Sequence, residues 1–170
     1  MDVLKAIEDR RSIRDYVEKI PSEEVVYSII ESGRLAPSAG NRQPLRFVVV
    51  WDREKIIKIA NVSMNFLKKV GVIMVGVADP KLSPKWYPVD LGIAFEHMVL
   101  AAQAQGLGTC WIGAFDEESV KKILEIPKDV TIVALLGVGY PRLKPNPTSR
   151  KKMEEIACRD QWNNPYTKKY

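Results

Sequence analysis

Apolar positions in the N-terminal part of the chain recur at helical spacing. They predict a short helix that Asp2 caps and that ends near Arg10. They also predict a second helix that Ser22 caps and that ends near Gly33. Residues 36–44, APSAGNRQP, then form a loop rich in residues that break helices and strands. The apolar stripes of the two helices are Val3, Leu4 and Ile7, and Val25, Val26, Ile29 and Ile30.

Four apolar runs predict the strands of the core. Residues 47–50 and 72–78 contain only apolar residues and one glycine, and we expect both strands to be buried on two faces. Residues 109–112 predict a short strand, and residues 130–140 predict the last core strand. Together with the helices, these runs predict an α+β fold.

Helical patterns fill the intervals between these runs. Residues 52–67 carry one or two helices, and Asp116 caps another after the third run. The longest helix spans residues 88–106 and ends at Gly106, which suits a C-terminal turn. The buried side of this helix comprises Leu91, Phe95, Met98 and Ala102.

The chain is predicted to be one domain with a C-terminal arm. A length of 170 residues suits a single domain over residues 1–170, and a hydrophobic content of 46% is sufficient for a core. Residues 141–170 are rich in proline and then in basic residues, and they carry no apolar stripe able to fold alone. We therefore expect these residues to form an extended arm.

Charge and composition exclude several classes of protein. The net charge is +5, but 26 basic residues are interleaved with 21 acidic ones, whereas nucleic-acid binders concentrate basic charge on one face. Two cysteines and one histidine are too few for a zinc cluster, so we expect no metal site. The start of the chain has no signal region and no segment suits a membrane span, which predicts a cytoplasmic protein without a membrane or nucleic-acid partner.

The candidate chemistry begins with the pentad RRSIR, in which Arg10, Arg11 and Arg14 surround Ser12. Guanidinium groups offer forks of donors that match phosphate oxygens, and the serine hydroxyl adds a neutral donor. We expect no acidic partners that would explain the arginines as structural residues. The pentad therefore indicates an anion clamp for a phosphate, although such clusters more often lie on solvated surfaces.

Two further segments are candidates for binding a ligand. Ser38, Asn41 and Gln43 place uncharged donors and acceptors within one short loop, which is either a binding loop or a plain connection. Residues 106–115, GLGTCWIGAF, join a helix to a strand, and Gly113 would let a flat ligand approach the backbone. The alternative explanation for this second segment is a tight connection between a helix and a strand that are both packed in the core.

The chain lacks the residues of several catalytic machineries. It contains neither a GxGxxG dinucleotide fingerprint after a strand nor a GxxxxGK[ST] phosphate loop. His97 is the single histidine, so no Ser-His-Asp set exists, and Cys110 is more simply a buried thiol than a nucleophile. We therefore expect no catalytic side chain, and a bound cofactor would carry the chemistry.

The chain resembles the nitroreductase family of FMN-dependent oxidoreductases in four ordered segments. They are RRSIR, APSAGNRQP, DLGIAFEH leading to GLGTCWIGAF, and a strand that ends in GVGYP. The resemblance covers nearly the whole chain. It implies a central, mostly antiparallel sheet flanked by helices, and a homodimer that exchanges C-terminal arms and holds two FMN sites at its interface.

The resemblance also implies a role for each candidate residue. The pentad and Arg150 would hold the FMN phosphate, with Arg14 also near the N1/O2 edge of the ring, where a cation stabilises negative charge. The backbone of residues 112–113 would face the ring near N5, and the loop would contact the flavin bound mainly by the other subunit. The implied cofactor-binding set is Arg10, Arg11, Ser12, Arg14, Pro37, Ser38, Ala39, Asn41, Gln43, Ile112, Gly113 and Arg150.

The implied reaction is a ping-pong cycle. NAD(P)H passes a hydride to FMN and leaves, and a small electron-poor acceptor such as a nitroaromatic, a quinone or a flavin takes its place. Reductive dehalogenation, flavin fragmentation and flavin binding without turnover remain open as alternatives. Residues 79–87 are shorter than the substrate-covering helices of many relatives, so Trp86 or Tyr87 would form a small aromatic wall. Asn61 and Asn65 are candidates for contact with the flavin edge.

Overall fold

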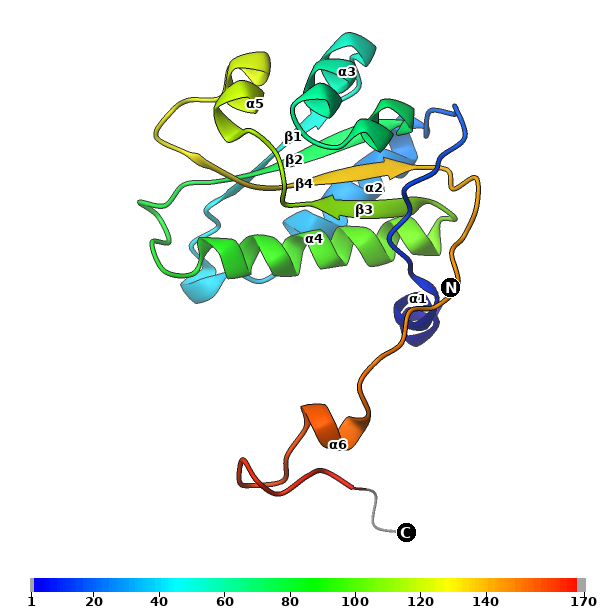
Figure 1. Ribbon diagram of the computed structural model, residues 1–170. Coiled ribbons are helices and arrows are strands. Elements are labelled where there is room, and N and C mark those ends of the chain that lie inside the picture. The colour runs from blue at the N-terminus through cyan, green and yellow to red at the C-terminus, as the bar shows by residue number, and fades with distance from the viewer. Residues whose placement is uncertain (1, 168–170) are drawn as a thin grey trace.

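A four-stranded antiparallel sheet forms the centre of the protein in the computed structural model, which describes residues 2–167 (Figure 1). The strand order is β1-β2-β4-β3, and each neighbouring pair is antiparallel. The strands are β1 (Leu45–Val50), β2 (Val72–Ala78), β3 (Gly108–Ile112) and β4 (Thr131–Gly139). The predicted α+β fold with a mostly antiparallel sheet is confirmed.

The two strands that were expected to be buried on both faces differ. All residues of β2 are buried. Ile73 belongs to the core on one face of the sheet, and Met74 belongs to the core on the other face. In β1 only Val50 is buried, so the prediction for residues 47–50 was wrong. The physical reason is the position of β1 at the edge of the sheet, where a strand has one neighbour instead of two.

Helices α2 (Glu23–Arg34) and α4 (Tyr87–Ala104) cover one face of the sheet (Figure 1). The side of α4 that was predicted to be buried packs on the sheet, and its four apolar residues are fully buried. At Gly76 of β2, an added Cβ would lie 2.6 Å from a methyl carbon of Leu91. The glycine therefore lets α4 approach the sheet closely.

The other face of the sheet carries α3 (Arg53–Asn61), the 3-10 helix η2 (Asn65–Lys69) and α5 (Glu117–Leu124). The side chains of Asp52 and Asp116 accept hydrogen bonds from backbone N–H groups at the starts of α3 and α5. These caps satisfy N–H groups that the helices leave free. The prediction of one or two helices within residues 52–67 agrees with α3 and with η2, although η2 continues to Lys69.

Helix α1 (Val3–Asp9) differs from its prediction in two respects. The side chain of Asp2 makes no capping hydrogen bond. The apolar stripe of Val3, Leu4 and Ile7 is exposed, and only Ala6 of this helix is buried. Helical spacing placed the three side chains on one face, but it could not show what that face contacts.

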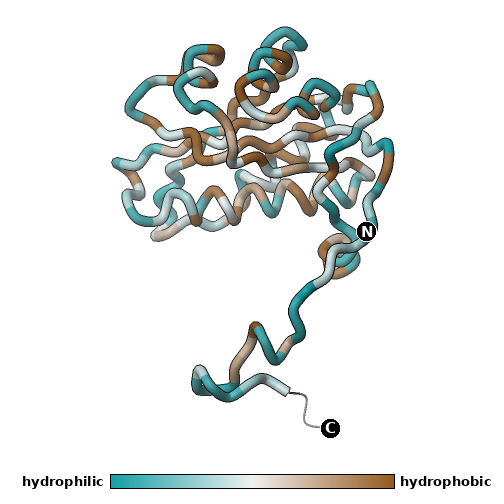
Figure 2. Tube along the Cα trace, viewed as in Figure 1, coloured by the Kyte–Doolittle hydropathy of each residue, from teal (hydrophilic) through white to brown (hydrophobic). Residues whose placement is uncertain are grey.

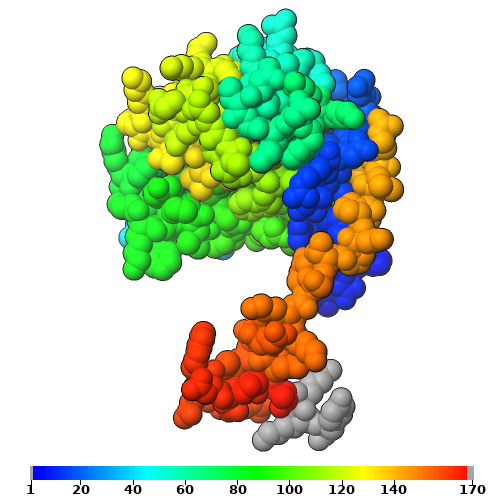
Figure 3. Space-filling view, in the orientation of Figure 1, coloured from blue at the N-terminus to red at the C-terminus, as the bar shows by residue number. Residues whose placement is uncertain are grey.

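Residues 141–167 form an arm that leaves the body of the protein. Figure 3 shows the first part of the arm beside the N-terminal segment and its end standing away from the body. The arm contains one short helix, α6 (Met153–Ile156), and a bridge between Cys158 and Pro165. The extended shape agrees with the prediction, while exchange of arms between subunits stays a prediction.

The hydropathy along the chain differs between the body of the protein and the arm. Figure 2 shows hydrophobic residues concentrated on the strands and on the inner sides of the helices, with a mainly hydrophilic arm. Within residues 2–167, no helix combines the length and apolar character needed to cross a membrane.

Candidate functional site

The arginine pentad lies in an extended segment that runs along β3. Ser12 forms a parallel bridge with Thr109, and the backbone N–H of Ile13 donates to the carbonyl oxygen of Thr109 at 2.9 Å. Ile13 and Tyr16 turn inward and are buried, and the hydroxyl of Tyr16 donates to the carbonyl oxygen of Ile13 at 2.7 Å. The apolar residues thus anchor the segment, while the polar residues line its outer side.

The outer side of this segment and the start of the arm enclose one cavity. Its volume is about 220 Å³. The arm reaches the pentad from far along the chain because Val17 donates to the carbonyl oxygen of Tyr140, which keeps the two segments side by side. The lining residues are Arg10, Arg11, Ser12, Arg14, Pro145, Asn146, Thr148 and Arg150. The structure therefore brings together the five basic and hydroxyl residues expected to bind one phosphate.

The guanidinium groups in this cavity are only partly satisfied. The Nε atoms of Arg10 and Arg11 are buried and have no hydrogen-bond partner among the described residues. A terminal nitrogen of Arg11 donates to the carbonyl oxygens of Glu8 and Arg10, each at 2.7 Å. A terminal nitrogen of Arg150 donates to the side chain of Thr148 at 2.6 Å. The two Nε atoms are inaccessible to solvent, but four guanidinium groups line the cavity, so it is suited to an anionic ligand.

One carboxylate faces the arginines, contrary to the expectation that they have no acidic partner. Oε1 of Glu96 lies 3.8 Å from Nε of Arg10, which is an ion pair but too long for a hydrogen bond. Partial burial raises the pKa of Glu96, although Arg10 acts against this shift. Within residues 2–167, no carboxylate forms an ion pair with Arg11, Arg14 or Arg150. One acid among four arginines leaves the cavity strongly cationic.

The second predicted segment, loop 37–43, is held by its own backbone and by one buried acid. The hydroxyl oxygen of Ser38 accepts from the N–H of Gln43 at 2.9 Å, and Oδ1 of Asp90 accepts from the N–H of Ala39 at 2.9 Å. Asn41 and Gln43 have positive φ angles of 53° and 48°, and their side chains are exposed. The loop is therefore a fixed turn that presents amide side chains to the surface.

Loop 37–43 does not join the arginine cavity within one chain. None of its residues lines that cavity. The loop is fixed to Asp90 in the first turn of α4, whereas the pentad pairs with Thr109 beyond the other end of this helix. Arg10 of the pentad also pairs with Glu96, six residues after Asp90, so the pentad and the loop lie along different parts of α4. Contact of the loop with a flavin held by another subunit stays a prediction.

The third predicted segment lies at the end of β3. Ile112 is buried in the core and is 3% exposed. Gly113 is exposed, and an added Cβ would meet no atom within 4 Å. Trp111 is half-buried and meets Phe95 edge to face, with ring centroids 5.1 Å apart. The chain thus offers open space at Gly113, directly after the end of β3.

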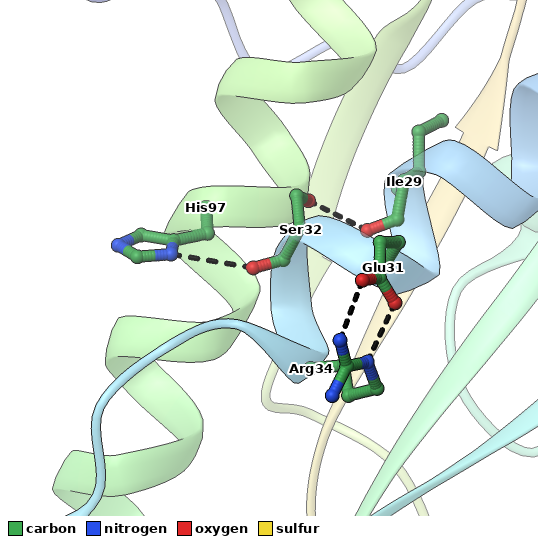
Figure 4. A network of polar contacts seen from close by, with 5 residues as sticks. All are labelled: Ile29, Glu31, Ser32, Arg34 and His97. Carbon is green, nitrogen blue, oxygen red and sulfur yellow. Dashed lines mark hydrogen bonds and ion pairs between the residues drawn. The ribbon is translucent and has the colours of Figure 1, made fainter.

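The other residues considered from the sequence lie away from this cavity. His97 of α4 is exposed and its Nδ1 lies 3.3 Å from the carbonyl oxygen of Ser32 on α2 (Figure 4). Cys110 is buried, and burial raises its pKa, which suits an inert thiol. Asn61 lines a separate surface hollow between α3 and α5, and Asn65 is exposed on η2. Residues 2–167 contain no group of three or more His, Cys, Asp or Glu that could hold a metal ion.

Sequence reasoning missed two acids and the polar residues of the arm. Glu96 and Asp90 lie on α4, which is otherwise mainly apolar, and an acid on such a helix is the signal that could have drawn attention to them. Asn146 and Thr148 line the arginine cavity, but they lie in a proline-rich tail and carry no distinguishing pattern. Their position depends on how the arm folds back.

Comparisons with known proteins agree with this geometry. A candidate NADH dehydrogenase/NAD(P)H nitroreductase of Archaeoglobus fulgidus is 36% identical over 152 residues, covering 83% of this chain and 86% of the relative. FMN reductase (NAD(P)H) of Bacillus subtilis is 29% identical over 164 residues, covering 82% of this chain and 66% of the relative. The crystal structure of a nitroreductase family protein of Clostridium novyi NT has a TM-score of 0.80 and 32% identity, covering 98% of this chain and 97% of the other.

The family assignment follows from the matched segments. The model of the nitroreductase family matches residues 7–81 and 72–140, which include the pentad, loop 37–43 and the end of β3. The resemblance predicted from four short segments is therefore confirmed over most of the chain. This chain belongs to the nitroreductase family.

Proposed function

We propose that the protein is an FMN-dependent oxidoreductase that passes electrons from NAD(P)H to a small electron-poor acceptor, such as a nitroaromatic compound, a quinone or a flavin. One observation carries the proposal. Four arginines, Arg10, Arg11, Arg14 and Arg150, line one cavity of about 220 Å³ together with Ser12, and among the described residues only Arg10 has a carboxylate partner. A phosphate group suits this cavity because its oxygens accept charge-assisted hydrogen bonds from several arginines at once.

Each part of the cavity would then have a role in holding FMN. The phosphate would bind the guanidinium groups and the hydroxyl of Ser12, and Arg150 would close the cavity from the arm. Arg14 is the more exposed arginine of the pentad and would lie toward the flavin ring. The ring would lie beside residues 112–113, where Gly113 leaves space for a flat group.

We also propose that the active unit is a homodimer in which loop 37–43 completes the site of the partner subunit. Exposed apolar side chains support this proposal. The stripe on α1 exposes between 53% and 65% of its side chains, and Trp162 on the arm is 89% exposed. An intertwined dimer would bury such residues, and it would bring the loop to a cavity that it does not reach in its own chain.

The chain would contribute binding and orientation instead of acid-base catalysis. When bound, FMN supplies the two-electron chemistry, accepting a hydride from NAD(P)H and delivering it to the acceptor. NAD(P)H and the acceptor would bind in turn at one position beside the flavin, which gives ping-pong kinetics. Burial raises the pKa of Cys110 and of Tyr16, so neither group exchanges protons readily near neutral pH. Protons would therefore come from water.

The absorbance spectrum of the purified protein tests this proposal. We expect flavin absorption bands that disappear when NAD(P)H is added without oxygen, and release of FMN on denaturation. A colourless protein that FMN cannot reconstitute would contradict the proposal.

Turnover measurements separate the reactions that the fold can support. We expect steady-state reduction of nitroaromatic or quinone acceptors with parallel-line kinetics. Turnover of halogenated acceptors alone would indicate reductive dehalogenation instead. Reduction of the bound FMN no faster than that of free FMN would indicate a flavin-binding module without turnover.

A further inference from the structure

Asp90 is a buried acid that connects two segments at the start of α4. Its side chain is 2% exposed. Oδ1 accepts a hydrogen bond from the backbone N–H of Ala39 at 2.9 Å, and Oδ2 accepts one from the hydroxyl of Ser83 at 3.2 Å. Ala39 belongs to loop 37–43, and Ser83 belongs to the segment that leads into α4. One carboxylate therefore holds both segments.

The bond to Ala39 holds a loop whose backbone is unusual. Gly40, Asn41 and Gln43 all have positive φ angles, and for residues other than glycine this conformation is unfavourable. The N–H of Asn41 donates to the carbonyl oxygen of Ser38, but that bond lies within the loop. The bond to Asp90 instead fixes the loop to α4, so it sets where the loop stands on the protein.

The bond to Ser83 holds two aromatic residues. Ser83 is 1% exposed, and its carbonyl oxygen accepts from the N–H groups of Trp86 at 3.3 Å and of Tyr87 at 3.1 Å. Trp86 remains 43% exposed. The aromatic pair is thus placed by Ser83, which is placed in turn by Asp90.

Burying a carboxylate costs free energy unless hydrogen bonds or nearby positive charge compensate for the loss of water. Within residues 2–167, no cation forms an ion pair with Asp90. Its location in the first turn of α4 offers the partial positive charge of a helix N-terminus, which offsets part of the cost of burial. The hydrogen bonds from Ala39 and Ser83 offset a further part of this cost.

We infer that Asp90 is a positioning residue that fixes loop 37–43 relative to Trp86 and Tyr87. The inference rests on the proposed function, in which the loop contacts the flavin of the partner subunit, and on the expectation that Trp86 or Tyr87 forms an aromatic wall for the acceptor. Asp90 then sets the space between flavin and aromatic wall, and this space selects acceptors by thickness and size. The residue acts through its two partners and touches neither flavin nor acceptor.

Three variants separate the two connections. Ser83→Ala removes only the connection to the aromatic pair, so KM for a quinone acceptor should rise several-fold while kcat and FMN affinity stay within about twofold of the parent. Asp90→Ala removes both connections, so FMN affinity should also fall. Asp90→Asn keeps an acceptor for Ala39 and a polar partner for Ser83, and it should recover much of both losses. Val89→Ala, in the same turn and 50% exposed, is the matched control and should behave as the parent.

Hydrogen exchange at the backbone N–H of Ala39 gives a measurement that needs no flavin. Exchange in the FMN-free protein should become about tenfold faster in Asp90→Ala, as expected for loss of a hydrogen bond to a charged group. It should stay unchanged in Ser83→Ala and Val89→Ala. If the protein binds no FMN at all, the proposed function fails, while this exchange experiment still tests the connection itself.

The inference is wrong if Asp90 serves only to stabilise the start of α4. In that case Asp90→Ala would lower the melting temperature, but Ala39 exchange measured well below that temperature would match the parent. It is also wrong if Ser83→Ala leaves KM unchanged. Should Asp90→Ala fail to fold, Ser83→Ala still decides the matter, because it removes the connection to the aromatic pair and leaves the bond from Ala39 to Asp90 in place.

Discussion

Compared with loop 37–43, the arginine cavity leaves far more of its polar groups without partners. The loop bonds its own backbone through Ser38 and is fixed to α4 through Asp90. The cavity is lined by four arginines, and one carboxylate, Glu96, forms an ion pair with one of them. Both regions are parts of the candidate site, yet one is complete within the chain and the other is not.

This difference indicates how loop 37–43 and the arginine cavity each respond when a ligand binds. A group that already has its hydrogen bonds loses little when the ligand is absent, so loop 37–43 is preformed. The arginines that line the cavity gain the most from an anion, because three of the four have no carboxylate partner among the described residues. Affinity for FMN should therefore depend mainly on the cavity, and selection among acceptors mainly on the loop and the residues connected to it.

The largest effect is expected from Arg10→Ala. The substitution removes a partly buried guanidinium group from the proposed phosphate site. A charge-assisted hydrogen bond contributes about 1.5–3 kcal/mol, so FMN affinity, measured by quenching of flavin fluorescence, should fall roughly tenfold to a hundredfold.

Lys5→Ala is the control for Arg10→Ala, because it removes an equal charge from α1, the helix that directly precedes Arg10. Lys5 pairs with Asp9 on the surface and does not line the cavity. FMN affinity should stay within about twofold of the parent in this variant. Near-parental affinity of Arg10→Ala would remove Arg10 from the phosphate site.

Gly113→Ala is expected to weaken FMN binding without lowering the stability of the fold. An added methyl group meets no atom of the chain, so the free energy of unfolding of the FMN-free protein should change by less than about 0.5 kcal/mol. The same methyl group would enter the space proposed for the flavin ring and weaken FMN binding by about 1–3 kcal/mol, the usual cost of overpacking. Unchanged binding would place the ring elsewhere.

Arg150→Ala should have a smaller effect than Arg10→Ala. Arg150 is exposed and is reached by solvent, which weakens its attraction to a phosphate. We expect a loss of about fivefold in FMN affinity that shrinks as salt is added, measured by the same titration. Lys151→Ala, the neighbouring charge outside the cavity, should show no loss. Equal effects of both variants would indicate general electrostatic attraction instead of a specific contact.

The smallest effect is expected from Glu96→Gln. Burial raises the pKa of Glu96 in the folded protein, so the folded state retains a proton that the unfolded state has already lost. Stability of the FMN-free parent should therefore fall as pH rises from the ordinary glutamate pKa through the raised one, and Glu96→Gln should lack this fall. Removing the carboxylate beside Arg10 should also tighten FMN binding by up to about fivefold at neutral pH. Weaker binding would show that Glu96 orients Arg10.

Local patterns predicted most elements of the fold. Strand β2 and helices α2, α4 and α5 follow from apolar runs, helical spacing and capping residues, all of which act over a few residues. The burial of β1 was predicted wrongly because the position of a strand in a sheet depends on partners far along the chain. The exposed stripe of α1 has the same cause, since spacing defines a face but not its partner.

The candidate site was predicted less completely than the fold. The pentad was visible because three arginines around a serine are a distinctive local pattern. Its meeting with Arg150 was expected only from the family resemblance. Glu96 and Asp90 were missed because each acts through a contact across the fold: Glu96 with Arg10, and Asp90 with Ala39 and Ser83. Such contacts leave no local signature in a single sequence.

The ratio of FMN affinity to riboflavin affinity tests most directly whether the arginine cavity is a phosphate site. The two ligands share the ring and the ribityl chain and differ only in the phosphate. The parent protein should bind FMN at least about a hundredfold more tightly than riboflavin, since several charge-assisted hydrogen bonds are involved. This ratio should shrink markedly in Arg10→Ala. Equal affinities for the two ligands in the parent protein would contradict the assignment.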